Sequence, residues 1–486
     1  MKKLLGSVLA LALVLSISQA NAELLKNFKF GGSIDLQATS ARNVLDFQTH
    51  PKANNGGDQI GNVQTRLMLN MDWDLLDDVH SRVTIRKNDR VWGSRTADTT
   101  PQDVNTVTTL LFVDEANVKI DKVFGYVDTT LGRQFYGEEG DLIIYYGPRH
   151  NQYGMNVDAI DAAKFDYNGE KLYVSVLAAN QSNGAAGRAI GNTAAAYNGR
   201  KDLRGLVVGT KGMENVDGKF YLYNAETHRF TTGLGADDSK NDNLYIAGIK
   251  AKAKFGGAFV SGEFAQNFGD YRVGAAPGNN ARYCGWAVKL DGGMKAEVAN
   301  IGTFSPWGNF SMGTGRDNSS ENQNAQFVSI NTDFRPGAIY GRFDRYNVGG
   351  LTFGSQINNG GAPATNPASD GLSNRVIWGV GVKANPAAVS KLTAGVSYWD
   401  FKFFRMTKTA TAPGVQDGQG NRHIGSEIDL DAEWKHSENV SFRAGVGTFQ
   451  PGGFIKEYKR GITRPAEAQD SENPALLSYF DVAIKF

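Results

Sequence analysis

Histidine and cysteine, two residue types that often carry out chemistry, are few in this sequence, and the numerous carboxylates form no recognisable acid/base pair. The six histidines are dispersed, and none belongs to the H-E-x-x-H pattern that places two zinc ligands on one helical face. The single cysteine, Cys284, can form neither an intramolecular disulfide nor a cysteine-based metal site. No G-x-S-x-G nucleophile elbow and no phosphate-binding P-loop occurs. The sequence therefore predicts a protein that is not an enzyme, with no catalytic residues, no metal site and no cofactor.

Charged residues instead follow a regular pattern, in which they alternate with apolar residues along segments of about ten residues. Ile428, Leu430 and Ala432 share one parity, whereas Asp429 and Asp431 share the other. Because successive side chains of a strand point to opposite faces, this pattern predicts strands with one apolar and one charged face. The same alternation recurs in residues 170–180 and 440–446.

The elements that would position these faces are strands joined by turns, and we predict an all-β fold. The chain has 58 glycines in 486 residues, well above the usual ~7%. No sustained helical periodicity follows residue 28, and the strand tally is about 18–20. Gly, Asn and Asp supply the positive φ that tight hairpin turns need. Short turns are predicted at Asn168-Gly169, Asp217-Gly218, Gly256-Gly257, Asp291-Gly292-Gly293 and Arg335-Pro336-Gly337.

The first 22 residues have the features of a cleavable signal peptide. Lys2 and Lys3 precede an apolar stretch over residues 4–17, and Ala20-Asn21-Ala22 provides the small-x-small cleavage pattern. The apolar stretch is shorter than the ~20 residues that cross a bilayer as a helix. We therefore predict two units, a signal peptide over residues 1–22 and one exported domain over residues 23–486.

Alternating strands behind a signal peptide are typical of outer-membrane barrels. Such barrels are antiparallel and run up and down, with short periplasmic turns and long extracellular loops. A closed barrel leaves no unpaired backbone group in lipid. The last strand also alternates and ends at Phe486, which resembles the signal read by the barrel-assembly machinery of Gram-negative bacteria. The sequence predicts one transmembrane β-barrel in the outer membrane, in contact with lipid and lipopolysaccharide.

In such a barrel the charged parity of each strand faces a water-filled lumen. Opposed acidic and basic groups there create a local field that selects among permeating ions. A barrel of ~16 or more strands encloses a channel unless loops fill it. Strand parity predicts these pore-lining residues: Arg66, Arg82, Arg86, Glu115, Lys250, Glu263, Arg342, Asp431 and Arg443.

Three short motifs resemble the alginate-export type of outer-membrane barrel. They are Leu131-Gly132-Arg133-Gln134, the stretch from Asp158 to Phe165, and Glu263-Phe264-Ala265-Gln266-Asn267-Phe268-Gly269. The resemblance implies a pore lined by arginine and lysine that conducts a polyuronate or, in relatives, small solutes. It also implies that Arg133 is a pore cation. Strand parity instead places Arg133 with Leu131 on the outer face, unless Gly132 forms a bulge.

The resemblance has departures that favour a general channel. Ala162 stands where the family pattern prefers glycine, and carboxylates at Asp429, Asp431 and Glu433 would repel a polyanion. The leading prediction is a porin for passive diffusion of small hydrophilic solutes and ions. One alternative is an alginate-export-like channel for a polyuronate or oligosaccharide, and another is a structural or adhesive barrel.

Partners are constrained only in part by the sequence. A formal net charge of +1 favours no nucleic-acid partner. An apolar outer face suits lipid and a neighbouring subunit equally well, so a homotrimer is compatible with the sequence.

Overall fold

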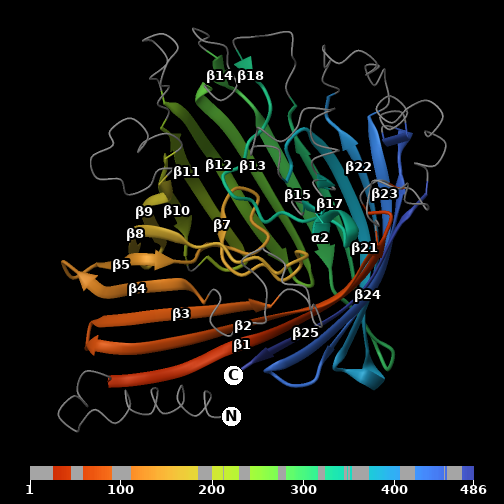
Figure 1. Cartoon of the computed structure of the whole chain (residues 1–486), viewed down its shortest axis with the longest axis horizontal. Coiled ribbons are helices and arrows are strands. Elements are labelled where there is room, and N and C mark those ends of the chain that lie inside the picture. Colours follow the sequence, from red (N-terminus) through yellow and green to blue (C-terminus); the bar gives the residue numbers. More distant parts are fainter. Residues whose placement is uncertain are drawn as a thin grey trace, which may run out of the picture.

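The protein is a closed antiparallel β-barrel of 18 strands, which confirms the predicted fold class. The computed structural model describes residues 26–44, 47, 59–89, 111–183, 200–211, 213–228, 241–271, 281–315, 323–343, 347–348, 351–352, 371–405, 422–453, 455–456 and 473–486. Each strand pairs with its neighbours in chain order, and β1 pairs with β25 to close the ring (Figure 1). The predicted signal peptide, residues 1–22, lies outside the described residues and stays a prediction.

The wall is built from long strands, most of them of 11 to 18 residues. They are β1 (Lys26–Arg42), β2 (Gln59–Leu76), β3 (Val79–Asp89), β4 (Phe112–Val123), β5 (Val127–Gln134), β8 (Ile160–Asn168), β9 (Leu172–Asn183), β10 (Arg200–Thr210), β11 (Val216–Thr227), β12 (Asp242–Phe255), β13 (Ala258–Tyr271), β15 (Trp286–Met294), β17 (Gly302–Gly313), β21 (Arg375–Pro386), β22 (Leu392–Phe403), β23 (His423–Lys435), β24 (Val440–Pro451) and β25 (Ala475–Lys485).

Short elements extend the wall or lie in the connections. Strands β14 (Ala281–Tyr283) and β16 (Ala296–Val298) continue the line of β15 and pair with β13 and β17. The others are β6 (Tyr136–Gly137), β7 (Tyr145–Tyr146), β18 (Gln323–Asn324), α2 (Ile339–Phe343), β19 (Asn347–Val348), β20 (Leu351–Thr352) and η1 (Ala387–Val389). None of the helices in the described ranges is long and apolar enough to cross a membrane.

Alternation sets the two faces of the wall as predicted. Val176, Leu430 and Val446 are each more than 40% exposed on the outer face. On β23 the intervening Glu427 and Asp429 are buried on the inner face. The outer face is therefore the apolar surface of the barrel.

Short and long connections alternate along the chain, and all the short ones lie at one end of the barrel. Phe486 lies at that end, where its backbone N–H and C=O bond to Gly32 (3.1 and 2.9 Å). At the opposite end the strands are joined by longer connections, such as residues 135–159 between β5 and β8.

Three predicted turns are corrected by the structure. Asp291-Gly292-Gly293 lies inside β15, where Gly293 leaves room for the Phe259 ring, 2.8 Å from the position of a Cβ. Asp217-Gly218 lies inside β11. Arg335-Pro336-Gly337 does turn, with φ of 77° at Gly337, but within a segment inside the barrel. A strand glycine can serve close packing as well as a turn, so glycine alone overcounts hairpins.

Two long connections fold into the ring of strands instead of projecting from it. One is the β5–β8 loop, residues 135–159. The other is the inner β17–β21 segment, residues 323–343, which carries α2. Figure 1 shows β7 and α2 inside the barrel. Among the residues that the structure describes, these two segments fill part of the lumen.

Candidate functional site

The β5–β8 loop enters the lumen because it carries an apolar run that water does not accommodate. Leu142, Ile143 and Ile144 are each at most 2% exposed. They belong to one apolar cluster with Leu244 and Ile246, which lie on the inner face of β12. Burial of apolar area at ~25 cal/mol per Å² stabilises this position of the loop.

The inner β17–β21 segment packs against the loop and pairs with its backbone. Tyr145 donates its N–H to the Asn331 carbonyl (2.8 Å), and Ile330 donates to the Ile143 carbonyl (3.0 Å). Phe327 and Phe334 join the same apolar cluster. The two segments therefore form one body inside the barrel.

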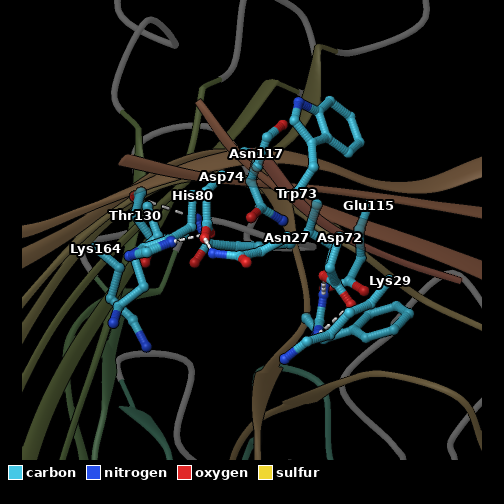
Figure 2. A pocket seen from close by; sticks show the side chains of 15 residues that line it. Asn27, Lys29, Asp72, Trp73, Asp74, His80, Glu115, Asn117, Thr130 and Lys164 are labelled. Carbon is cyan, nitrogen blue, oxygen red and sulfur yellow. Dashed lines mark hydrogen bonds and ion pairs between the residues drawn. The ribbon is translucent and has the colours of Figure 1, made fainter. Parts of the chain in front are cut away.

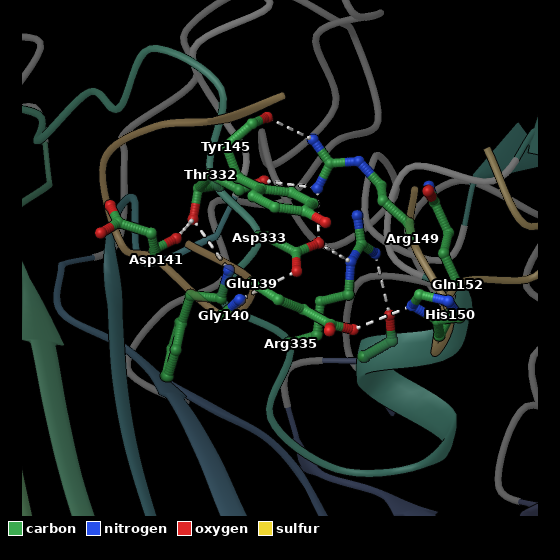
Figure 3. Close-up of polar contacts among 12 residues, drawn as sticks. Glu139, Gly140, Asp141, Tyr145, Arg149, His150, Gln152, Thr332, Asp333 and Arg335 are labelled. Carbon is green, nitrogen blue, oxygen red and sulfur yellow. Dashed lines mark hydrogen bonds and ion pairs between the residues drawn. The ribbon is translucent and has the colours of Figure 1, made fainter. Parts of the chain in front are cut away.

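Arg149 connects the loop and the segment, and Figure 3 shows its guanidinium beside Tyr145, Thr332 and Asp333. Its guanidinium is 1% exposed and forms ion pairs with Asp158 and Asp333. The same group donates to the Thr332 carbonyl (3.1 Å). A buried cation with several acceptors is satisfied only in one geometry, so Arg149 holds the loop and the segment in register.

Wall charges hold the loop on the β11–β12 side. Lys219 and Lys250 each lie within 3.5 Å of the Glu138 carboxylate and 3.8 Å of Asp141. On the same wall Tyr221 donates its hydroxyl to Glu263 (2.8 Å). Oppositely charged groups on wall and loop thus join where the apolar cluster ends.

Arg66 holds the loop on the β1–β2 side. Its side chain is fully buried, and it donates to Asp35 on the neighbouring strand (2.8 Å). It also donates to the loop carbonyls of Arg149 and Met155 (3.1 and 3.0 Å). The guanidinium thus bridges wall and loop.

Carboxylates of β23 hold the inner β17–β21 segment at the start of α2. Glu427 is fully buried and accepts the backbone N–H groups of Ile339 (2.6 Å) and Tyr340 (3.1 Å). Asp429 accepts the N–H of Ala338 (3.2 Å). The unpaired N–H groups of a helical turn are thereby satisfied by the barrel wall.

A polar cavity of about 810 Å³ lies toward the short-turn end, against β2, β3 and β4, and we call it the vestibule (Figure 2). Arg82 and Glu115 line it, together with Lys29, Lys119 and Lys164. Arg82 donates to Asp72 (2.6 Å), and both side chains keep more than a third of their surface exposed. The vestibule is therefore a charged space whose side chains stay partly exposed.

A second cavity of about 410 Å³ lies beside the two inner segments, and we call it the constriction cavity. Glu139, Asp333 and Arg335 line it from the inner segments (Figure 3). Trp307 and Trp399 line it from β17 and β22. This cavity is thus lined by charged groups of the inner segments and by indole rings of the wall.

The inner segments carry two carboxylates whose pKa is lowered. Burial raises the pKa of Glu138, but Lys219 and Lys250 outweigh burial and hold it below its usual value. A hydrogen bond with His150 lowers the pKa of Glu139, at an oxygen to nitrogen distance of 3.4 Å. Both groups carry negative charge near neutral pH.

No group of metal-binding side chains occurs within the ranges that the structure describes.

The predicted pore-lining residues fall into two groups in the structure. The first group lies on the inner face of the wall and faces the vestibule or the interior of the barrel. Arg82 and Glu115 face the vestibule, and Arg443 donates to the loop residue Asn151 (2.7 Å). Asp431 lies on the inner face of β23, 2.8 Å from the Cβ position of Gly395. The second group makes contacts that hold the fold, and it comprises Arg66, Arg86, Lys250, Glu263 and Arg342.

Two of these predictions are corrected in their geometry. Arg133 shares the outer face of β5 with Leu131 and lies 3.6 Å from Asp161, while Thr130 and Gln134 line the vestibule. Gly132 has φ of 116°, but no register shift occurs there, so no bulge turns Arg133 inward. Arg133 is therefore removed from the proposed pore lining.

Arg342 belongs to α2 and not to a wall strand. It forms an ion pair with Asp481 (2.7 Å) and lies over the ring of Tyr479. Its place inside the barrel thus comes from the inserted segment, whereas the prediction relied on strand parity.

Sequence reasoning missed the two inner segments, although a signal for one of them exists. Leu142-Ile143-Ile144 is an apolar run in the connection between β5 and β8. On β12, Leu244 and Ile246 are apolar on the charged parity. A strand with two apolar faces needs a cover on its inner side, and the apolar run is that cover.

Neither a protein-family model nor a curated protein matches this sequence. Solved structures do match along nearly the whole chain. OccK11 (OpdR) of Pseudomonas aeruginosa is 9% identical, with 94% of this chain and 95% of that chain covered and a TM-score of 0.51. OccAB1 of Acinetobacter baumannii is 9% identical, with 95% and 98% covered and a TM-score of 0.52.

A variant of OccD1 (OprD) is 11% identical, with 95% and 96% of the chains covered and a TM-score of 0.51. At these identities the likeness concerns the fold. The chain thus shares its overall fold with these three proteins.

Proposed function

We propose that this protein is an outer-membrane porin through which small hydrophilic solutes and ions diffuse passively. The observation that carries the proposal is that the lumen is partly filled by inserted segments and keeps polar cavities beside them. Two segments are pinned inside it, and polar cavities of about 810 and 410 Å³ remain beside them. Rings of charge in a narrowed, hydrated barrel select by size and sign.

The proposed setting follows from the same fold. The apolar outer face contacts lipid and lipopolysaccharide, and the alternating strand β25 ending at Phe486 is the part that the barrel-assembly machinery reads. Export uses the predicted signal peptide, residues 1–22. The long-connection end faces the outside, as in barrels whose termini lie in the periplasm.

The test is single-channel recording of the refolded mature protein in a planar bilayer under a salt gradient. We expect a steady conductance with weak ion selectivity. Silence from a barrel that is folded by circular dichroism would contradict the proposal and favour a structural or adhesive role.

Adding an oligouronate to the same bilayer tests the polyuronate alternative. Anion-selective current that micromolar oligouronate blocks would favour an alginate-export-like channel. We expect no such block, because Glu139 places a carboxylate on the β5–β8 loop and Asp431 places another on the inner face of β23.

A further inference from the structure

Two tryptophans lie on the inner face of the wall. Large apolar rings are not expected there, because most inward residues of such a barrel are polar. Trp307 pairs with Gly381, and Trp399 pairs with Gly379, on either side of β21. Val380, between the two glycines, is 49% exposed on the outer face. The glycines and both indoles therefore face inward, and both tryptophans line the constriction cavity.

The two glycines of β21 leave the space that the indole rings occupy against the strand. A Cβ on Gly379 would stand 2.3 Å from the Trp399 ring, and one on Gly381 would stand 2.7 Å from Trp307. The ring centroids are 5.2 Å apart at an interplanar angle of 46°. The indoles thus cover the bare backbone of β21 from both sides and form a shallow aromatic platform.

Polar groups that can hydrogen-bond to a ligand surround this platform. Asn309 donates to Asp291 (2.6 Å), and Asp291 lies 3.2 Å from Lys289. Across the cavity Asp333 is paired with Arg335 (3.0 Å). Both cations at the platform are thus paired with carboxylates, and Glu139 adds a further carboxylate to the same cavity.

We propose that the Trp307–Trp399 platform binds a pyranose ring of a neutral saccharide. The C–H faces of a pyranose are apolar and stack on indole, while its hydroxyls need both donors and acceptors at the edge. A cavity of about 410 Å³ lies within the range of small-molecule sites. An anionic sugar would need cations that carboxylates do not already neutralise.

This inference rests on the proposed channel function, and one experiment tests the two separately. Maltotriose is added to the open wild-type channel in a planar bilayer, and interruptions of the ionic current are titrated. We expect concentration-dependent block. Trp307→Ala and Trp399→Ala should each weaken maltotriose binding by about tenfold. Gly379→Ala keeps both indoles but displaces the Trp399 ring, so it should weaken binding as well.

Trp378→Ala is the matched control, because Trp378 lies on the outer face of β21 against Tyr398, with ring centroids 5.2 Å apart. It should leave both conductance and block unchanged. Normal conductance without maltotriose block would overturn the platform and leave the porin standing, whereas absence of conductance would contradict the porin. Stronger block by trigalacturonate or by tetramethylammonium, or block unaffected by the two tryptophan substitutions, would also overturn the neutral saccharide.

Discussion

The two sides of the lumen obey the same strand alternation and differ in what they face. On β12 the inner face carries Leu244 and Ile246, and the β5–β8 loop covers them. On β2 and β3 the inner face carries Asp72 and Arg82, and the vestibule remains open beside them. The chemistry of the inward residues, and not the barrel itself, therefore decides which part of the lumen is filled.

The largest effect is expected when the contact between the β5–β8 loop and the inner face of β12 is disrupted. Ile143→Asp places a carboxylate without a partner in the apolar cluster, which costs about 3–5 kcal/mol. The β5–β8 loop should leave its place, and single-channel conductance should rise severalfold. Ile143→Val keeps the apolar contact and should conduct like the wild type. Unchanged conductance in a folded Ile143→Asp barrel would show that the loop does not narrow the channel.

Low pH should also loosen the β5–β8 loop, with a smaller effect than Ile143→Asp, because Glu138 becomes protonated. Its lowered pKa means that the ion pairs with Lys219 and Lys250 stabilise the loop fully above the ordinary carboxyl pKa and are lost as the pH falls through the lowered one. Open-channel noise in bilayer recordings should therefore rise only below about pH 4.

Two glutamine variants check this assignment. Glu138→Gln should show the added noise already at neutral pH, whereas Glu297→Gln, at the exposed short-turn end, should behave like the wild type. A wild-type channel that stays quiet through pH 3 would remove Glu138 from the account.

A smaller effect, on ion selectivity, is expected at the vestibule side of the lumen. Arg82 faces the vestibule, while Arg86 is buried against Asp114 (2.7 Å). Arg82→Gln should shift the reversal potential in a salt gradient by a few millivolts toward cation preference. Arg86→Gln should shift it less and destabilise the barrel more, because it leaves Asp114 buried and unpaired. The opposite order would mean that Arg86 lines the path.

The smallest expected effect belongs to Arg133. Because it lies on the outer face of β5, Arg133→Gln should change neither conductance nor reversal potential in the same bilayer recordings. A shift comparable to that of Arg82→Gln would return Arg133 to the pore lining and support the implication of the family resemblance.

The wall of this barrel is readable from the sequence because strand alternation is a local property. Each residue of β23 takes its face from the residue before it, so Leu430 and Asp431 could be assigned without knowing any neighbour. The same locality placed Arg133 outward on parity alone. Lipid on one side and water on the other then select opposite residue types for the two faces.

The state of the lumen depended on contacts between residues far apart in the chain. The apolar run at Ile143 covers Ile246, and Arg149 pairs with Asp333, across separations that no local pattern encodes. Arg342 reached the interior through a helical turn, where a period of two has no meaning. Trp307 and Trp399 became one platform only because β21 lies between their strands. Alternation thus determined the barrel and its two faces, whereas tertiary packing alone decided which inward residues meet water.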